Sequence, residues 1–347
     1  MKDCDYFRQV IKFRHFPDAN MWIRSMKDLL DAHCIQLSQG KFAAVSAVLA
    51  FRSSSYSLSK FDKTCCVRFK PAEPDVLICI MRSPDSLQTN FGYAERGRAL
   101  AFVLDGSSSF IGRLEQGTRV AMLHMPHDRF AKMVQSWFGF ASPLQVKRLL
   151  KRGVSVPSSL FDNCVLAKTI LDEEDGAQQT INAEHAGEDA SIEASLILAF
   201  LAALVPLAEY GNAFTSDSHH LSLLEKAVDF ILINYAEKIM LTELCEICGA
   251  SASTLIGVFT RYLGITPMKF ILMVRLQEAH TLLCSVTAHS SVTNVATEVG
   301  FWHFGRFSGY YRSHFLELPS ETLWGSPTLP NEVSDNSWAV QECLPTV

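Results

Sequence analysis

The chain has 347 residues, of which 48% are hydrophobic and 19% charged, a composition typical of a globular protein long enough for two domains. The formal net charge of -5 at pH 7 argues against a general affinity for polyanions, so any nucleic-acid function must rest on local charge placement. Charged residues at the amino terminus leave no room for a signal peptide, and we expect a cytoplasmic protein. The ten cysteines follow no disulfide spacing and are expected to be buried or free thiols.

The first domain is predicted to be β-rich and to cover residues 1–140. Runs of Val, Ile, Leu and Phe between residues 42 and 125 are separated by the turn signals KPAEPD, SPDS, DGSSS and LEQG. This pattern indicates a sandwich or small barrel of the cupin-like kind. HMPHD, His124 to Asp128, raises the alternative of a metal site, but further ligands at a suitable spacing are missing. We favour a solvated pair of histidines and expect neither metal nor cofactor.

Residues 141–218 are predicted to form a helical and acidic linker region. Asp172 to Glu193 is acidic, small and polar, which is typical of an exposed loop. The apolar run from Ser195 to Ala208 is too short for a membrane span and is interrupted by Pro206. We expect no membrane association and keep two alternatives for this run, a dimerisation or interdomain helix and a buried helix of the first domain. Residues 325–347 are predicted to be a loose tail.

An internal duplication fills the last third of the chain. Gly249 aligns with Gly300 and Leu255 with Phe307, so the second copy has one extra residue in its turn. Each copy reads as a short helix, a glycine turn, a second helix with apolar residues every four positions and a final proline. This is the helix-turn-helix pattern, in which the second helix faces the major groove. The sequence between the copies predicts a long linker helix.

The second helix of each copy separates into an inner and an outer face at about 100° per residue. The predicted inner residues are Leu255, Val258, Phe259 and Tyr262 in the first copy and Phe304, Phe307, Tyr311 and Phe315 in the second. The outer faces are small, hydroxylated or cationic, which suits contact with phosphates and base edges. The residues predicted to contact DNA are Ser253, Thr254, Gly257, Thr260, Arg261, His303, Arg306, Gly309, Arg312 and Ser313.

The segments LTELCEICGASASTLIGVFTRYLGITPMKFILMVRLQEAH and VTNVATEVGFWHFGRFSGYYRSHFLELPSETL resemble the AraC/XylS family of bacterial transcriptional regulators. The resemblance implies an α+β protein in which two helix-turn-helix subdomains and a linker helix occupy residues 219–324. It also implies binding to double-stranded promoter DNA, activation of transcription with RNA polymerase as partner, and association with the nucleoid when DNA is bound.

Residues 1–140 are more faintly similar to the β-rich sensing domains of this family, and QLSQGKFAA and GFWHFGRFS are similar to ethanolamine-utilisation regulators. A sensing domain implies a small-molecule effector, or a homodimer formed through this part of the chain. The sequence departs from the family at Gly257 and Gly309, where basic residues are common. Residues 219–324 hold seven basic side chains against nine carboxylates, so a few arginines and the helix N-termini must carry the attraction to phosphate.

Two other classes of function share parts of this pattern. DNA-repair alkyl transferases share the helix-turn-helix unit but need an activated cysteine after a proline. No cysteine here follows a proline, and GxSxG and GxxxxGK[ST] are missing, so we expect no enzyme. The CEIC sequence, Cys245 to Cys248, has no second ligand pair and aligns with Ala296 and Val299, which favours a core position over a metal or redox site. A helical interaction module that does not bind DNA explains the helices but not the character of their outer faces.

Overall fold

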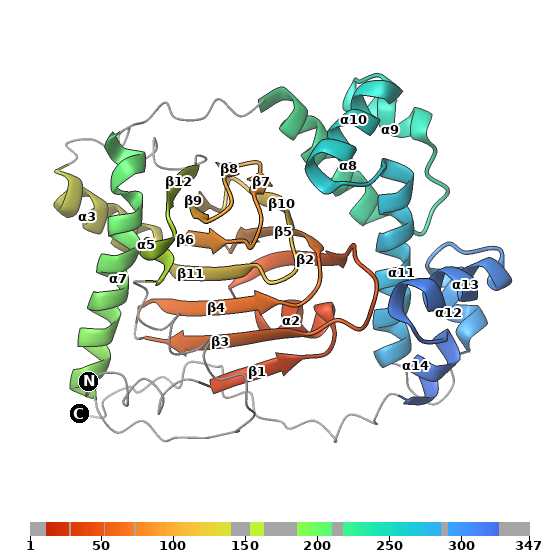
Figure 1. The fold of residues 1–347 in the computed structure, drawn as a ribbon, viewed down its shortest axis with the longest axis horizontal. Coiled ribbons are helices and arrows are strands. Elements are labelled where there is room, and N and C mark those ends of the chain that lie inside the picture. The colour runs from red at the N-terminus through yellow and green to blue at the C-terminus, as the bar shows by residue number, and fades with distance from the viewer. Residues whose placement is uncertain are drawn as a thin grey trace.

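The computed structural model shows a β-rich N-terminal domain followed by an all-helical C-terminal domain (Figure 1), which confirms the predicted α+β arrangement. The structure describes residues 12–139, apart from 28, 52 and 73, together with residues 153–162, 186–209, 218–285 and 291–325. The predicted tail after residue 325 and most of the predicted acidic loop lie outside the described residues.

The N-terminal domain is a sandwich of two antiparallel sheets. The larger sheet has the strand order β1-β3-β4-β11-β6-β9-β12 and the smaller β2-β5-β10-β7-β8. The strands are β1 (Lys12–Phe16), β2 (Leu30–Gln36), β3 (Ala44–Ala50), β4 (Ser55–Phe61), β5 (Cys65–Pro71), β6 (Asp75–Arg82), β7 (Leu87–Thr89), β8 (Gly92–Ala94), β9 (Arg98–Asp105), β10 (Phe110–Leu114), β11 (Arg119–Pro126) and β12 (Gly153–Pro157).

Both faces of the larger sheet are buried, which is why its strands alternate only partly in the sequence. On β6, Ile78 and Ile80 face one core, whereas Leu77 and Cys79 face a second core between the two sheets. Helices cover the first of these faces (Figure 1). The helices of this domain are α2 (Ala19–Ser25), α3 (His127–Phe138), α5 (Ser158–Asp162) and α7 (Ala186–Glu209).

The space between the sheets is filled by aromatic rings. Phe110 stacks on Phe69 and Phe102 with centroid separations of 4.7 and 5.3 Å, and Phe91 stacks on Phe102 at 4.7 Å. From α2, the Trp22 indole enters the same core and donates a hydrogen bond to a serine hydroxyl of β4 at 3.1 Å. Rings that pack this closely make the interior a solid core.

The stretch predicted as a linker, residues 141–218, contains parts of the N-terminal domain. β12 pairs with β9 at the edge of the larger sheet, and α7 packs against β6, β9 and β12. Leu196, Phe200 and Leu204 of α7 are buried in the core on that face. The structure therefore shows the buried-helix alternative for the apolar run, because one side of that helix is needed to cover the sheet.

The C-terminal domain has seven helices in its described residues and one core. They are α8 (Ser218–Asn234), α9 (Leu241–Cys248), α10 (Ala252–Leu263), α11 (Pro267–Ser285), α12 (Val292–Glu298), α13 (Phe304–Phe315) and α14 (Pro319–Gly325). Among the described helices, no single one is long and apolar enough to cross a membrane, whereas α9 and α10 meet that test only as a pair bent by 90°.

Candidate nucleic-acid interface

The first helix-turn-helix unit consists of α9 and α10. The two helices are bent by 90° about Gly249, whose φ of 66° places it in the left-handed region that ends many helices. The Ser251 hydroxyl caps α10 by accepting a hydrogen bond from the Thr254 amide at 3.2 Å. The four residues predicted to face inward on α10 are all buried. Of the residues predicted to contact DNA, Thr254 is half-buried, and the exposed ones are Ser253, Gly257, Thr260 and Arg261.

The second unit, α12 and α13, corrects the prediction at one position. Phe307, Tyr311 and Phe315 are buried as predicted, but Phe304 is 43% exposed. Phe301 of the turn fills the inner place instead, with its ring 4.9 Å from that of Phe307. Phe304 is the first residue of α13 and lies beyond the edge of the core. His314 is buried as well, although no apolar pattern predicted it.

The predicted DNA-contacting residues of α13 form one exposed surface. They are His303, Arg306, Gly309, Arg312 and Ser313. Among the described residues, neither Arg306 nor Arg312 forms an ion pair, so both guanidinium groups are available to an anion. His303 occupies the N-cap position without a side-chain cap, which leaves the first amides of α13 without the partner that Ser251 supplies to α10. Arg261 of α10 lies over the ring of Tyr262 at 5.4 Å.

The two units are fixed to each other through α8 and α11. From α11, Arg275 donates hydrogen bonds to the carbonyl oxygens of Tyr235 at 2.7 Å and Glu237 at 2.6 Å, at the end of α8. Burial lowers the pKa of Arg275, which agrees with a structural role rather than a phosphate contact. Gly300, in the turn of the second unit, lies directly on the Ala236 backbone between those two carbonyls. Such contacts hold α10 and α13 at a set separation.

The N-terminal domain contacts the C-terminal end of both α10 and α13. Arg113 of β10 donates a hydrogen bond to the Leu263 carbonyl at the last turn of α10, at 3.0 Å. The Gly40 amide donates to the His314 carbonyl of α13 at 2.8 Å, and the Gln39 side chain lies 3.3 Å from the Ser313 hydroxyl. A conformational change in the N-terminal domain can therefore displace the C-terminal ends of the helices predicted to contact DNA.

The rest of the interdomain interface is apolar with charged pairs around it. Ile35, Cys66 and Ile111 from the smaller sheet enter the core of the C-terminal domain. The Arg68 guanidinium pairs with Asp229 of α8 at 2.6 Å, and its side chain is only 15% exposed. Sequence reasoning found none of these residues, because contacts between elements far apart in the chain leave no local pattern.

A buried polar chain also joins the domains. The Asp18 carboxylate, which caps α2, lies 3.3 Å from Nε2 of His280 on α11. Nδ1 of His280 is 2.6 Å from the Tyr311 hydroxyl of α13, which donates to Thr322 of α14 at 2.8 Å. Burial lowers the pKa of His280 and raises that of Tyr311, so both groups are held neutral in the folded protein.

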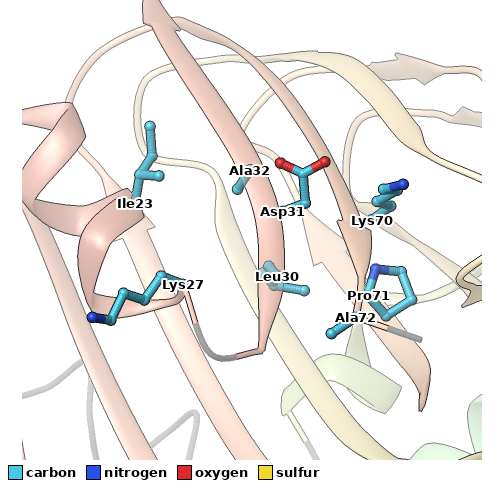
Figure 2. A pocket seen from close by; sticks show the side chains of 8 residues that line it. All are labelled: Ile23, Lys27, Leu30, Asp31, Ala32, Lys70, Pro71 and Ala72. Atoms are coloured by element: carbon cyan, nitrogen blue, oxygen red, sulfur yellow. The ribbon is translucent and has the colours of Figure 1, made fainter. Parts of the chain in front are cut away.

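The pockets of the N-terminal domain include two beside α2. One, of about 350 Å³, is lined by β1 and α2 on one side and by Thr281, Cys284 and Ser285 of α11 on the other, so both domains contribute to it. A shallower one, of about 420 Å³, lies between α2, β2 and β5, where Figure 2 shows Asp31 and Lys70 on neighbouring strands.

The residues that suggested a metal or redox site in the sequence make ordinary structural contacts instead. His124 lies 3.1 Å from the Asp75 carboxylate and is partly buried, so the expected solvated histidine pair is wrong for this residue, although His127 is exposed. Burial lowers the pKa of His124 despite that carboxylate. Cys245 and Cys248 are free thiols, and Cys248 is buried. Among the described residues, no cluster of three or more ligands for a metal ion occurs.

Comparisons with known proteins agree with the geometry of this domain. Residues 244–323 match a family of helix-turn-helix domains. The XylDLEGF operon transcriptional activator 2 of Pseudomonas putida is 40% identical over 100 residues, which are 28% of this chain and 64% of that protein. A probable thc operon regulatory protein of Rhodococcus erythropolis is 33% identical over 102 residues, 29% of this chain and 31% of that protein.

Among solved structures, a probable AraC family transcriptional regulator from Rhodopseudomonas palustris is 35% identical over 30% of this chain and 96% of that chain, with a TM-score of 0.29. The matched segment spans less than two thirds of the length of the Pseudomonas putida activators. The fold and the two exposed helix faces define the C-terminal domain as a double helix-turn-helix DNA-binding domain. It belongs to the AraC/XylS family.

Proposed function

We propose that the whole protein is a sequence-specific regulator of transcription that binds promoter DNA through both helix-turn-helix units and acts as an activator. The observation that carries the proposal is the pair of exposed, small or cationic helix faces on α10 and α13, fixed to one scaffold by Arg275. Exposed arginines beside glycines suit contact with phosphates and guanine edges. The relatives named as operon activators support the activating role.

The test is a comparison of two variants with the same loss of charge. Arg306→Ala/Arg312→Ala removes two cations from the outer face of α13, whereas Lys226→Ala/Lys238→Ala removes two exposed cations from α8 and from the segment between α8 and α9. Binding of full-length protein to fragments of its own genome is measured by fluorescence anisotropy. We expect at least a tenfold loss for the arginine variant, since each base or phosphate contact contributes about 1–3 kcal/mol. Equal affinities of the two variants would refute the proposal.

The pKa values of the cysteine thiols argue against the alternative of an alkyl-transfer enzyme. An activated thiol needs a lowered pKa. Here burial raises the pKa of Cys66, Cys79 and Cys248, and a hydrogen bond with Cys65 together with burial raises that of Cys34. We therefore propose a regulator without catalytic activity, located in the cytoplasm and associated with the nucleoid when DNA is bound.

For the N-terminal domain we propose control of the DNA-binding domain through their shared interface. The contacts at the ends of α10 and α13 support this proposal, as does the pocket of about 350 Å³ to which both domains contribute. A small-molecule effector in that pocket would change the contact between α2 and α11. RNA polymerase as the partner in activation, and a homodimer as the active form, complete the proposal.

A further inference from the structure

The turn of the second unit exposes two large aromatic side chains. Trp302 is 76% exposed, and Phe304 is 43% exposed at the first position of α13. Because Phe301 already fills the inner place of this turn, neither ring is needed by the core. Trp302 lies in the part of the turn that is one residue longer than its counterpart in the first unit, where Ala250 and Ser251 alone separate Gly249 from α10.

The position of these rings is the part of the unit that meets base edges. In helix-turn-helix proteins the N-terminal residues of the second helix contact base edges in the major groove. In α10 the first position holds Ala252, followed by the exposed Ser253, whose hydroxyl can donate and accept hydrogen bonds. In α13 the first position holds Phe304, with Trp302 two residues before it. The two units therefore differ in chemistry where the second helix begins, which is small and hydroxylated in α10 and aromatic in α13.

A phenyl ring can recognise only one feature of the major groove. It has no hydrogen-bonding group for the donors and acceptors of the bases, and the apolar group that base pairs present there is the C5-methyl of thymine. The cations Arg306 and Arg312 on the same helix favour a polyanion beside this surface rather than an apolar protein partner. Covering an exposed ring with a methyl group is favourable through burial of apolar area.

We propose that Trp302 and Phe304 contact thymine methyl groups in the half-site bound by α13, while α10 reads its half-site through hydrogen bonds. This assignment rests on the proposed DNA-binding function and adds to it the chemistry by which one half-site is recognised. It predicts that the second half-site contains thymine at one or two positions where the methyl group itself is required.

The experiment begins with selection of duplexes from a randomised pool by the full-length protein. In the selected duplex each thymine is then replaced in turn by deoxyuridine, which removes the methyl group and keeps every hydrogen-bonding group. We expect the wild type to bind about three- to fivefold more weakly at one or two positions of a single half-site, as the transfer free energy of one methyl group implies. Phe304→Ala and Trp302→Ala are expected to bind the thymine duplex more weakly and to lose this discrimination.

Trp324→Ala is the matched control, because Trp324 is 82% exposed but lies on α14, and this variant should discriminate as the wild type does. Circular dichroism checks that all three variants are folded. A selected duplex whose thymines can all be replaced without loss would overturn the assignment and leave a protein partner as the reason for the exposed rings. Discrimination that persists in both aromatic variants would overturn it too. Selection of no sequence by the wild type would instead refute DNA binding itself.

Discussion

The two turn glycines offer a matched test of how the helix-turn-helix units are held together. Both have a positive φ, 66° at Gly249 and 85° at Gly300. A Cβ at Gly249 would meet no atom within 4 Å, whereas one at Gly300 would lie 2.4 Å from the Ala236 carbonyl oxygen. That carbonyl cannot easily move, because Arg275 binds the carbonyls on both sides of it.

The expected costs of alanine differ accordingly. Gly249→Ala should lose about 1–2 kcal/mol, the cost of a left-handed backbone for an L residue. Gly300→Ala should lose that amount and about 1–3 kcal/mol more, because overpacking forces the end of α8 away from the second turn. Native-state hydrogen exchange of the backbone amides measures the loss separately in α9–α10 and in α12–α13.

We expect protection of α13 to fall further in Gly300→Ala than protection of α10 falls in Gly249→Ala. DNA affinity should follow, because the displaced turn changes the separation of α10 from α13. Equal losses within about 0.5 kcal/mol would refute the reasoning, since the backbone term alone would then account for both positions.

Two further predictions concern the interface and acid. Arg68→Ala should weaken the contact between the domains far more than Lys41→Ala, and the effect is measured as faster exchange of the α8 amides. Lys41 pairs with Glu317 at 3.0 Å, but its side chain is 75% exposed and the pair is screened by water. Similar effects of the two variants would contradict the assigned role of burial. Burial lowers the pKa of His314 to about 4, so its neutral form stabilises the fold above its unfolded pKa near 6.5, and this stability is lost as pH falls from 6.5 towards 4. At pH 5 the loss is about 2 kcal/mol, and His314→Gln should lack this part of the acid sensitivity in urea titrations; an unchanged pH profile would count against it.

The helix-turn-helix units could be predicted in detail because their pattern is local. Apolar spacing along α10 identified all its buried residues except Leu263, and Gly249 and Gly300 marked the turns. Phe304 was the exception, because a helical wheel treats every residue on the inner side of a helix as buried, even one at the end of the helix where the core no longer reaches. Whether a ring at that end is covered depends on Phe301 in the preceding turn, which no periodicity includes.

The N-terminal domain could be predicted only in class. The strands of its larger sheet are buried on both faces, so the alternation of apolar and polar residues that marks a strand is weak. β12 is also far in the sequence from its partner β9. The contacts that join the domains, such as Arg113 with the end of α10 and Asp18 with His280, come from residues more than a hundred positions apart. Nothing in the local sequence distinguishes these residues from ordinary surface side chains.

The central claim is that two helices on one fixed scaffold read two neighbouring half-sites, and sequencing of genomic fragments bound by the purified full-length protein tests it most directly. We predict enriched sites made of two unlike half-sites with centres one helical turn, about 10–10.5 base pairs, apart. Changing that spacing by about five base pairs should abolish binding, because the second helix would face the wrong side of the duplex. Enrichment of a single half-site, or binding that tolerates any spacing, would contradict the account.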